Sequence, residues 1–432
     1  MSLFTSKRLM LWGAGLCALS WFIHIHTMMT PGLVDRVGRL KGSDYVQFYV
    51  MGSLLRDGRA DALYDAHAHL TEGQQRITPK LRLYAAHPNY GPQVALAFVP
   101  LAALPYSLSL LTFLVVSALA YAIGVWLVWR DCEALQAHGR LIAVHAAGSP
   151  LWLTVVRYGQ ASAFALLACA LALSAFRRER LFLAGLAIGC LAYKPQLGLL
   201  FGIVVLVSRQ WRVAAGAAAA IAAQLLVAWI AAGSDALTRY GQELWLLARD
   251  PRLIETHASE LHSVRGFVHL LVPYPSVVTG CAIAALAVAV VLAVWTWSSS
   301  SPLPLRVGEL VVLTILASPH LITYDLLLLT LPLIVFADWA VRHPTHRLRA
   351  AVSLSLVPVY FAPFSGMIVA RLTGVQISVI AMAALAWWMY VACREASAER
   401  QDKTDSLAIV APRWDAVSSQ NSTTRGWRSS AA

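Results

Sequence analysis

The chain has 432 residues, of which 58% are hydrophobic and only 13% are charged, and its mean hydropathy is +0.62. A soluble domain is close to half apolar and one quarter charged, so this composition excludes an ordinary soluble protein and indicates an integral membrane protein. Long apolar stretches favour helices over a β-barrel. The net charge of +12 does not indicate a nucleic-acid partner. The basic residues gather in short clusters between apolar stretches, as expected for cytoplasmic loops.

The first apolar stretch follows the basic pair Lys7-Arg8 and extends to about Met29. It is longer than a secretory signal and lacks a small-residue cleavage site, so it predicts a first transmembrane helix with a cytoplasmic N-terminus. Hydropathy and loop charge together predict about twelve crossings. The apolar stretches are 8–30, 107–129, 141–157, 160–176, 181–193, 195–208, 213–232, 268–298, 306–318, 324–341, 349–364 and 372–392.

This topology places the polar, motif-like segments together on the outer face of the membrane. Residues 44–57 have an amphipathic helical pattern that Ser43 or Asp44 could cap, and such a helix can lie at the membrane surface. Residues 91–105 are short and rich in proline, so we expect a re-entrant or interfacial segment. The outer segments are 31–90, 157–160, 194–196, 233–266, 318–325 and 365–371. Residues 1–393 form one predicted membrane domain, and 394–432 a disordered cytoplasmic tail.

Two ionisable residues stand out in this pattern. Asp44 follows the first span, and a carboxylate near aromatic side chains and lipid would have a raised pKa, as a general base requires. The alternative is a simple helix cap, which the residue alone favours. Lys194, in Tyr193-Lys194-Pro195-Gln196, lies between two short apolar stretches. A cation there is costly and points to function, such as binding a lipid-linked phosphate, although a snorkelling lysine is the structural alternative.

Further candidates lie in the other outer segments. Arg157 could hold a phosphate and Gln160 a sugar hydroxyl, or both could belong to a tight turn. Arg265 is a second phosphate-binding candidate. His320 could orient a substrate or a carboxylate, while Asp325 opens a leucine-rich stretch and is most simply a helix cap. No metal site is predicted. The six cysteines are scattered, and the spacing of His257, Glu260 and His262 favours a solvated loop over a metal centre.

The order of the motifs resembles glycosyltransferase family 87. Asp44 with Tyr45 and Tyr49 resembles the acidic-aromatic opening of that family, and Tyr64-Asp65 resembles the close of the same unit. The remaining matches are Asn89-Tyr90-Gly91-Pro92, Phe98-Val99-Pro100-Leu101 with Leu104-Pro105, Gly159-Gln160, Gly185, Lys194-Pro195-Gln196, Ser318-Pro319-His320 and Tyr324-Asp325. The chain departs from the family pattern at Gly91, in place of a proline, and at Ala161-Ser162, in place of asparagine-rich residues.

The resemblance implies an all-α polytopic enzyme of the GT-C fold that uses a polyprenyl-phosphate-linked sugar, with mannosyltransferases as the known type. It implies Asp44 as the catalytic base and no cofactor. Substrate would be bound by Tyr45, Tyr49, Arg157, Gln160, Lys194, Gln196, Arg265 and His320. The expected partners are the lipid-linked donor, a glycan or glycolipid acceptor and membrane lipid, with the active site on the extracytoplasmic face of a bacterial inner membrane.

Two other functions remain open on the sequence. A transporter or lipid flippase also uses broken helices and polar groups at membrane depth. Transporters often contain internal repeats, and the sequence shows none. An inactive scaffold, in which Asp44 is only a cap, is the third possibility. Activity that depends on Asp44, with lipid binding intact, would distinguish an enzyme from such a scaffold.

Overall fold

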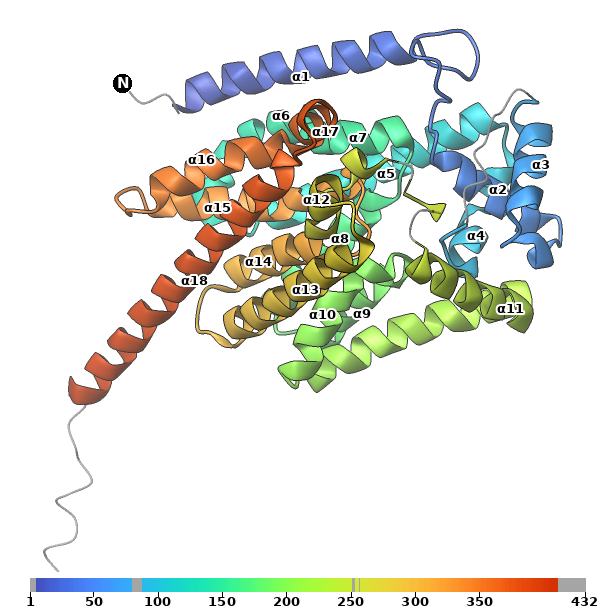
Figure 1. Cartoon of the computed structure of the whole chain (residues 1–432). Coiled ribbons are helices and arrows are strands. Elements are labelled where there is room, and N and C mark those ends of the chain that lie inside the picture. Colours follow the sequence, from blue (N-terminus) through green and yellow to red (C-terminus); the bar gives the residue numbers. More distant parts are fainter. Residues whose placement is uncertain (1–4, 80–87, 251–252, 256, 411–432) are drawn as a thin grey trace, which may run out of the picture.

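The computed structural model describes residues 5–79, 88–250, 253–255 and 257–410. Within these ranges the chain is helical and forms no strand. Its β pairings there are isolated bridges, Val34 with Leu40 and Leu261 with Ile322. The helices pack into one bundle, with α1 (Ser6–Met28) lying across one side of it and α18 (Ile377–Val410) projecting away at the other end (Figure 1). The all-helical prediction is therefore confirmed.

Six helices of the described residues are long and apolar enough to cross a membrane, or up to seven if one bent pair is a single span. The bent pair is α16 (Arg349–Tyr360) and α17 (Ala362–Thr373), which meet at 72°. The prediction of about twelve crossings is not confirmed by this count. The six are α1, α5 (Tyr106–Trp129), α11 (Trp211–Arg249), α13 (Pro275–Ser298), the 3-10 helix η7 (Thr323–Leu329) with α15 (Thr330–Arg342), and α18 up to Asp402.

The other predicted crossings are shorter or broken helices. The stretch 141–157 is not one helix, because the chain bends at Gly148 and Pro150 begins a new helix without a backbone N–H to offer the previous turn. Pro195 begins α10 in the same way, and its 13 residues extend only about 20 Å. These helices are α6 (Gly139–Ala147), α7 (Pro150–Tyr158), α8 (Ser162–Arg177), α9 (Leu181–Gly189), η4 (Cys190–Tyr193), α10 (Pro195–Val207), α12 (Val264–Leu271) and α14 (Leu303–Ala317).

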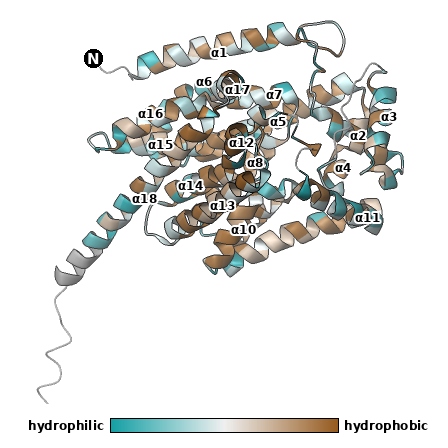
Figure 2. Ribbon diagram, viewed as in Figure 1, coloured by the Kyte–Doolittle hydropathy of each residue, from teal (hydrophilic) through white to brown (hydrophobic). Residues whose placement is uncertain are grey.

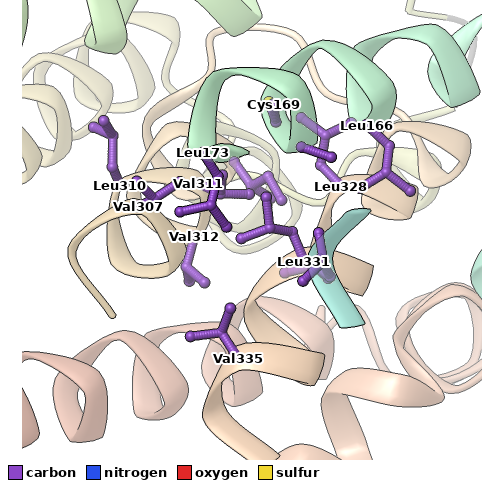
Figure 3. Packing of buried hydrophobic residues seen from close by; sticks show 14 of the residues in the cluster. Leu166, Cys169, Leu173, Val307, Leu310, Val311, Val312, Leu328, Leu331 and Val335 are labelled. Atoms are coloured by element: carbon purple, nitrogen blue, oxygen red, sulfur yellow. The ribbon is translucent and has the colours of Figure 1, made fainter. Parts of the chain in front are cut away.

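The centre of the bundle is a core formed by α8, α14, α15 and α18. Figure 3 shows side chains of α8, α14 and α15 meeting there, and Leu173, Val311 and Leu331 are fully buried. Because lipid tails are as apolar as leucine, close packing rather than transfer from water stabilises such a core. Figure 2 shows the apolar character of these central helices, with hydrophilic residues concentrated near α3 (Ala66–Arg76) and the far ends of α11 and α18.

A second core surrounds α2 (Tyr45–Arg56), the helix predicted from residues 44–57. Nine of its 12 residues are buried, so α2 is a packed interior helix, and the expectation that it lies on the membrane surface is not confirmed. Phe48 stacks on Phe98 with ring centroids 4.8 Å apart, and Tyr45 lies 5.1 Å from Phe113. The elements around α2 are η1 (Ala60–Ala62), α3 (Ala66–Arg76), α4 (Pro92–Phe98) and η2 (Leu101–Ala103).

The short helix α4 and the long helix α11 bring the outer segments together. α4 has 7 residues, about 10 Å of helix, so the segment 91–105 is too short to cross. α11 continues from the apolar stretch into the polar segment 233–249 and is bent at Gly233, whose φ is +80°. Its far half packs on α4 and η1, and Tyr64 meets Tyr240 at 5.7 Å. The outer segments 31–90 and 233–266 are thus neighbours.

The beginning of the predicted tail is helical. α18 continues past Arg394 to Val410, so the expectation of disorder from 394 onward is wrong for residues 394–410. Those residues include several alanines, glutamates and arginines, which favour helix when a preceding helix provides the nucleus. Residues 411–432 lie outside the described part of the chain.

Candidate active site

Asp44 occupies the N-cap position of α2 but does not cap the helix. Its side chain makes no capping hydrogen bond, which contradicts the structural alternative considered from the sequence. Instead, Gln160 Nε2 donates to Oδ2 at 3.0 Å and Ser43 Oγ donates to Oδ1 at 3.1 Å. The backbone N–H of Asp44 donates to the Tyr158 carbonyl at 3.0 Å. Asp44 is therefore anchored to the junction between α7 and α8, 116 residues away in sequence.

Gln160 is held in one orientation by the groups around its carbonyl oxygen. Oε1 accepts from the Tyr90 hydroxyl at 3.1 Å and from the Ala161 N–H at 3.1 Å. Two donors at Oε1 fix which end of the amide is the acceptor, so Nε2 must face Asp44. Gly159 makes this turn possible, because its φ is +71° and a Cβ there would lie 2.7 Å from the Tyr45 Cβ.

A buried ion pair lies on the other side of the same turn. Lys194 Nζ is 2.6 Å from Asp325 Oδ1, and the two side chains are 3% and 2% exposed. Ser162 Oγ donates to the same Asp325 oxygen at 2.6 Å. The ammonium also lies 4.8 Å from the centre of the Tyr324 ring. Asp325 is thus the counter-ion of Lys194, and its interpretation as a helix cap is wrong.

The turn Gly159–Ser162 connects the two acids. Gln160 contacts Asp44, and Ser162 contacts Asp325. The Tyr193 hydroxyl donates to the Ala161 carbonyl at 2.8 Å, which ties in the residue before Lys194. Polar residues from five separate parts of the chain therefore meet at one end of α8 and α10. The short Gly-Gln and Lys-Pro motifs therefore lie close together in the folded protein, although neither motif indicates this in the sequence.

The environment of Asp44 alters its acidity. Burial raises the pKa of this carboxyl above its usual range, while the hydrogen bonds from Gln160 and Ser43 and the charge of Lys194 offset part of the rise. A carboxylate with a raised pKa is a stronger base, and one that keeps free lone pairs can accept a proton from a nearby hydroxyl. Asp44 has the properties of a general base.

The other predicted cations each have a carboxylate partner. Arg157 lies 3.6 Å from Asp35 and is 35% exposed at its side chain. Arg265 pairs with Glu255, which also accepts from His320 Nδ1 at 3.0 Å. Burial raises the pKa of Glu255, but the hydrogen bonds and charges of His320 and Arg265 outweigh it, and the pKa is below its ordinary value. Of Arg157, Arg265 and His320, Arg157 has the most exposed side chain and is the most open to a ligand.

The hydroxyl groups of Tyr45 and Tyr49 are engaged inside the protein, whereas within the described residues the Gln196 side chain is not. The Tyr45 hydroxyl bonds Ser109 at 2.5 Å, and the Tyr49 hydroxyl donates to the Leu104 carbonyl at 3.0 Å. Both rings are buried in the core around α2. Gln196 is half-buried in the first turn of α10 and makes no hydrogen bond with the described residues.

Sequence reasoning missed three side chains that organise the site: Tyr90, Ser162 and Glu255. Tyr90 and Ser162 lie inside motifs named in the sequence analysis, but neither side chain carries a charge that would single it out. Asp325 was named, but its partnership with Lys194 was not. A signal existed, since a lysine and an aspartate at membrane depth each require a counter-charge. No group of His, Cys, Asp and Glu side chains in the described residues could hold a metal ion. Within the weak His-Glu-His pattern, His262 is buried and bonds Ser378 and Thr323.

One comparison with known proteins gives a match. The model of glycosyltransferase family 87 matches residues 89–319, more than half of the chain. The matched range includes Tyr90, Gln160 and Lys194, whereas Asp44 precedes it and Asp325 follows it. No curated protein and no solved structure is significantly similar to this chain. With its apolar helices and this match, the chain is a membrane protein that belongs to glycosyltransferase family 87.

Proposed function

We propose that this glycosyltransferase moves a mannose-like hexose from a polyprenyl-phosphate donor to an acceptor hydroxyl, with Asp44 as the general base. The observation that carries the proposal is the state of the Asp44 carboxylate. It is not used in capping, Gln160 and Ser43 orient it, and burial raises its pKa. Each property suits proton abstraction from an alcohol.

The proposed reaction has one bond-forming and one bond-breaking event. The acceptor oxygen forms a bond to the anomeric carbon of the sugar, and its proton passes to an Asp44 carboxylate oxygen. The bond between the anomeric carbon and the phosphate oxygen breaks, and polyprenyl phosphate leaves with the electron pair. The proton on Asp44 then returns to solvent. The resemblance to the GT-C enzymes implies inversion at the anomeric carbon.

The leaving phosphate requires a cation near Asp44. Arg157 is the best placed of the predicted set, because its side chain is 35% exposed and its ion pair with Asp35 is long at 3.6 Å. The carbonyl of the next residue, Tyr158, accepts the Asp44 N–H. Lys194 is 3% exposed and already neutralised by Asp325. We therefore propose that Arg157 binds the donor phosphate directly and that Lys194 contributes mainly through its positive field and by holding the site together.

We place the reaction at the extracytoplasmic face of the membrane. The polar segments gather at one end of α8, α10 and α14, and the clusters Arg177–Arg180 and Arg209–Arg212 lie at the other end of α8 and α10. Basic loops face the cytoplasm in membrane proteins. The transporter or flippase alternative has no observation that favours it.

The direct test is sugar transfer by purified protein in lipid vesicles from radiolabelled polyprenyl-phosphate mannose to a crude acceptor extract. We expect Asp44→Asn to lower transfer by about 100-fold or more. Asp61→Asn, at an exposed acid of η1, is the matched control and should retain wild-type transfer. Transfer by Asp44→Asn near the wild-type rate would contradict the base assignment. Failure of the wild type with every polyprenyl-phosphate hexose would contradict the donor assignment.

A further inference from the structure

A cavity of about 600 Å³ lies at the end of the bundle opposite the candidate active site. Its cationic lining is Arg209, Arg212 and Arg306, and its aromatic lining is Phe176, Trp211 and Trp297. These residues come from the turn between α10 and α11 and from the facing ends of α13 and α14. The turn between α10 and α11 lies well away from α2 in Figure 1.

The distance from the active site follows from the helices that connect the two places. α8 begins at Ser162, beside Asp325, and ends next to Phe176, which lines the cavity. Its 16 residues extend about 24 Å. α10 likewise begins beside Lys194 and ends before Arg209. A separation of this size approaches the thickness of the hydrocarbon core, so the two places belong to opposite membrane faces.

The charge of the cavity is uncompensated. No carboxylate lines it, and Arg209 and Arg212 form no ion pair with the described residues. Arg306 donates through Nη1 to the Trp297 carbonyl at 3.0 Å, but its Nε has no acceptor among the described residues. Three guanidinium groups that converge from two segments about 100 residues apart in sequence create a strong positive potential in a concave site.

Two buried polar atoms of the lining also lack a partner among the described residues. Trp297 is only 6% exposed, yet its indole N–H donates to nothing, and Gln210 Oε1 is a buried acceptor without a donor. A buried polar group without a hydrogen bond destabilises the fold. These atoms are enclosed by protein, so the groups that can reach a ligand in the cavity are the guanidinium groups of Arg209, Arg212 and Arg306, which bind an anion.

The backbone favours the same kind of ligand. Leu181, Trp211 and Leu303 line the cavity and are the first residues of α9, α11 and α14. Three helix N-termini, with their partial positive charges, thus meet at the place where the arginines gather. This arrangement exceeds the requirement of the positive-inside rule, which places cations in loops but does not gather them around a cavity.

The rim of the cavity identifies the source of the ligand. Leu206, Val207 and Trp211 beside it are 55%, 56% and 64% exposed, as expected for side chains that face lipid. Phe182 and Leu183 of α9 are also exposed. We propose that this cavity binds the phosphodiester headgroup of an anionic phospholipid of the facing leaflet through Arg209, Arg212 and Arg306. The lipid chains lie along the exposed apolar rim.

The test compares phosphatidylglycerol with phosphatidylcholine, measured by native mass spectrometry of the full-length protein in detergent. We expect wild type to bind phosphatidylglycerol at least tenfold more tightly. Arg209→Gln/Arg212→Gln should lose most of this preference, because both arginines are exposed and their replacement leaves the packing intact. Arg140→Gln/Arg349→Gln removes the same charge from the same end of the bundle outside the cavity and should keep the preference.

Three results would overturn the proposal. An equal loss in the two double variants would show that bulk charge alone attracts the lipid. Unchanged binding in Arg306→Gln, which removes the guanidinium group opposite Arg209 and Arg212, would show that the headgroup does not enter the cavity. Equal affinity for soluble glycerophosphoglycerol would show that the ligand is a free phosphodiester and not a lipid. None of these measurements depends on the glycosyltransferase reaction.

Discussion

The ion pair between Lys194 and Asp325 makes the strongest prediction about the stability of the candidate site. The two side chains are 3% and 2% exposed and their charged atoms are 2.6 Å apart. Lys194→Ala leaves Asp325 with Ser162 as its remaining hydrogen-bond donor in a setting that solvent does not reach. Removing one partner of a buried pair costs about 3–5 kcal/mol, because the other charge is left uncompensated. We therefore expect a large loss of stability.

The matched control is Arg347→Ala. Arg347 pairs with Glu395 at the protein surface, and its side chain is 78% exposed. Such exposed pairs contribute about 0–1 kcal/mol. The double variant Lys194→Ala/Asp325→Ala removes both charges and should cost less than the sum of the two single variants, because no buried charge is left alone.

Thermal unfolding can be followed with a thiol-reactive dye. Cys132, Cys169 and Cys393 are buried and become reactive only when the bundle opens. We expect the melting temperature to fall far more in Lys194→Ala than in Arg347→Ala, with partial recovery in the double variant. Equal, small shifts in Lys194→Ala and Arg347→Ala would refute the view that this pair holds the α8, α10 and η7 ends together.

The remaining predictions concern Asp44 and the turn that orients it. Gln160→Ala removes a hydrogen bond that lowers the Asp44 pKa, so the rising limb of the pH–rate profile should move to higher pH and transfer should fall roughly tenfold; an unchanged midpoint would separate Gln160 from the base. Because burial raises the Asp44 pKa above its ordinary 3.8, the ionised carboxylate destabilises the fold as pH rises above that value. Asp44→Asn should therefore melt no lower than wild type at pH 7, and a marked drop in its melting temperature would contradict this. Gly159→Ala should destabilise more than Gly58→Ala. Both glycines have positive φ, but only at Gly159 would a Cβ meet another residue, Tyr45, at 2.7 Å. Equal melting temperatures would show that the turn can relax.

The sequence by itself determined the class of the protein and the segments that carry its site. Composition and apolar stretches were sufficient for an all-helical membrane protein, because lipid leaves the backbone few ways to satisfy its hydrogen bonds. The order of short motifs around Asp44, Gly159-Gln160 and Lys194 was sufficient for the family. The helical segment after Asp44 was also predictable, since apolar residues at helical spacing specify a buried face.

Only the tertiary structure decided which of these residues are partners. Loop charge cannot distinguish a full span from two short helices broken at Pro150, so the predicted number of crossings exceeds the number of long apolar helices in the described residues. Hydropathy cannot reveal that α2 is buried on most sides rather than lying on lipid. The pairing of Lys194 with Asp325 joins residues 131 apart in sequence. Asp44 accepts a hydrogen bond from Gln160 and does not cap α2, and Gln160 reaches it because the chain folds back at Gly159. Local pattern specifies helices, whereas counter-charges and hydrogen-bond partners are chosen by the packing of distant helix ends.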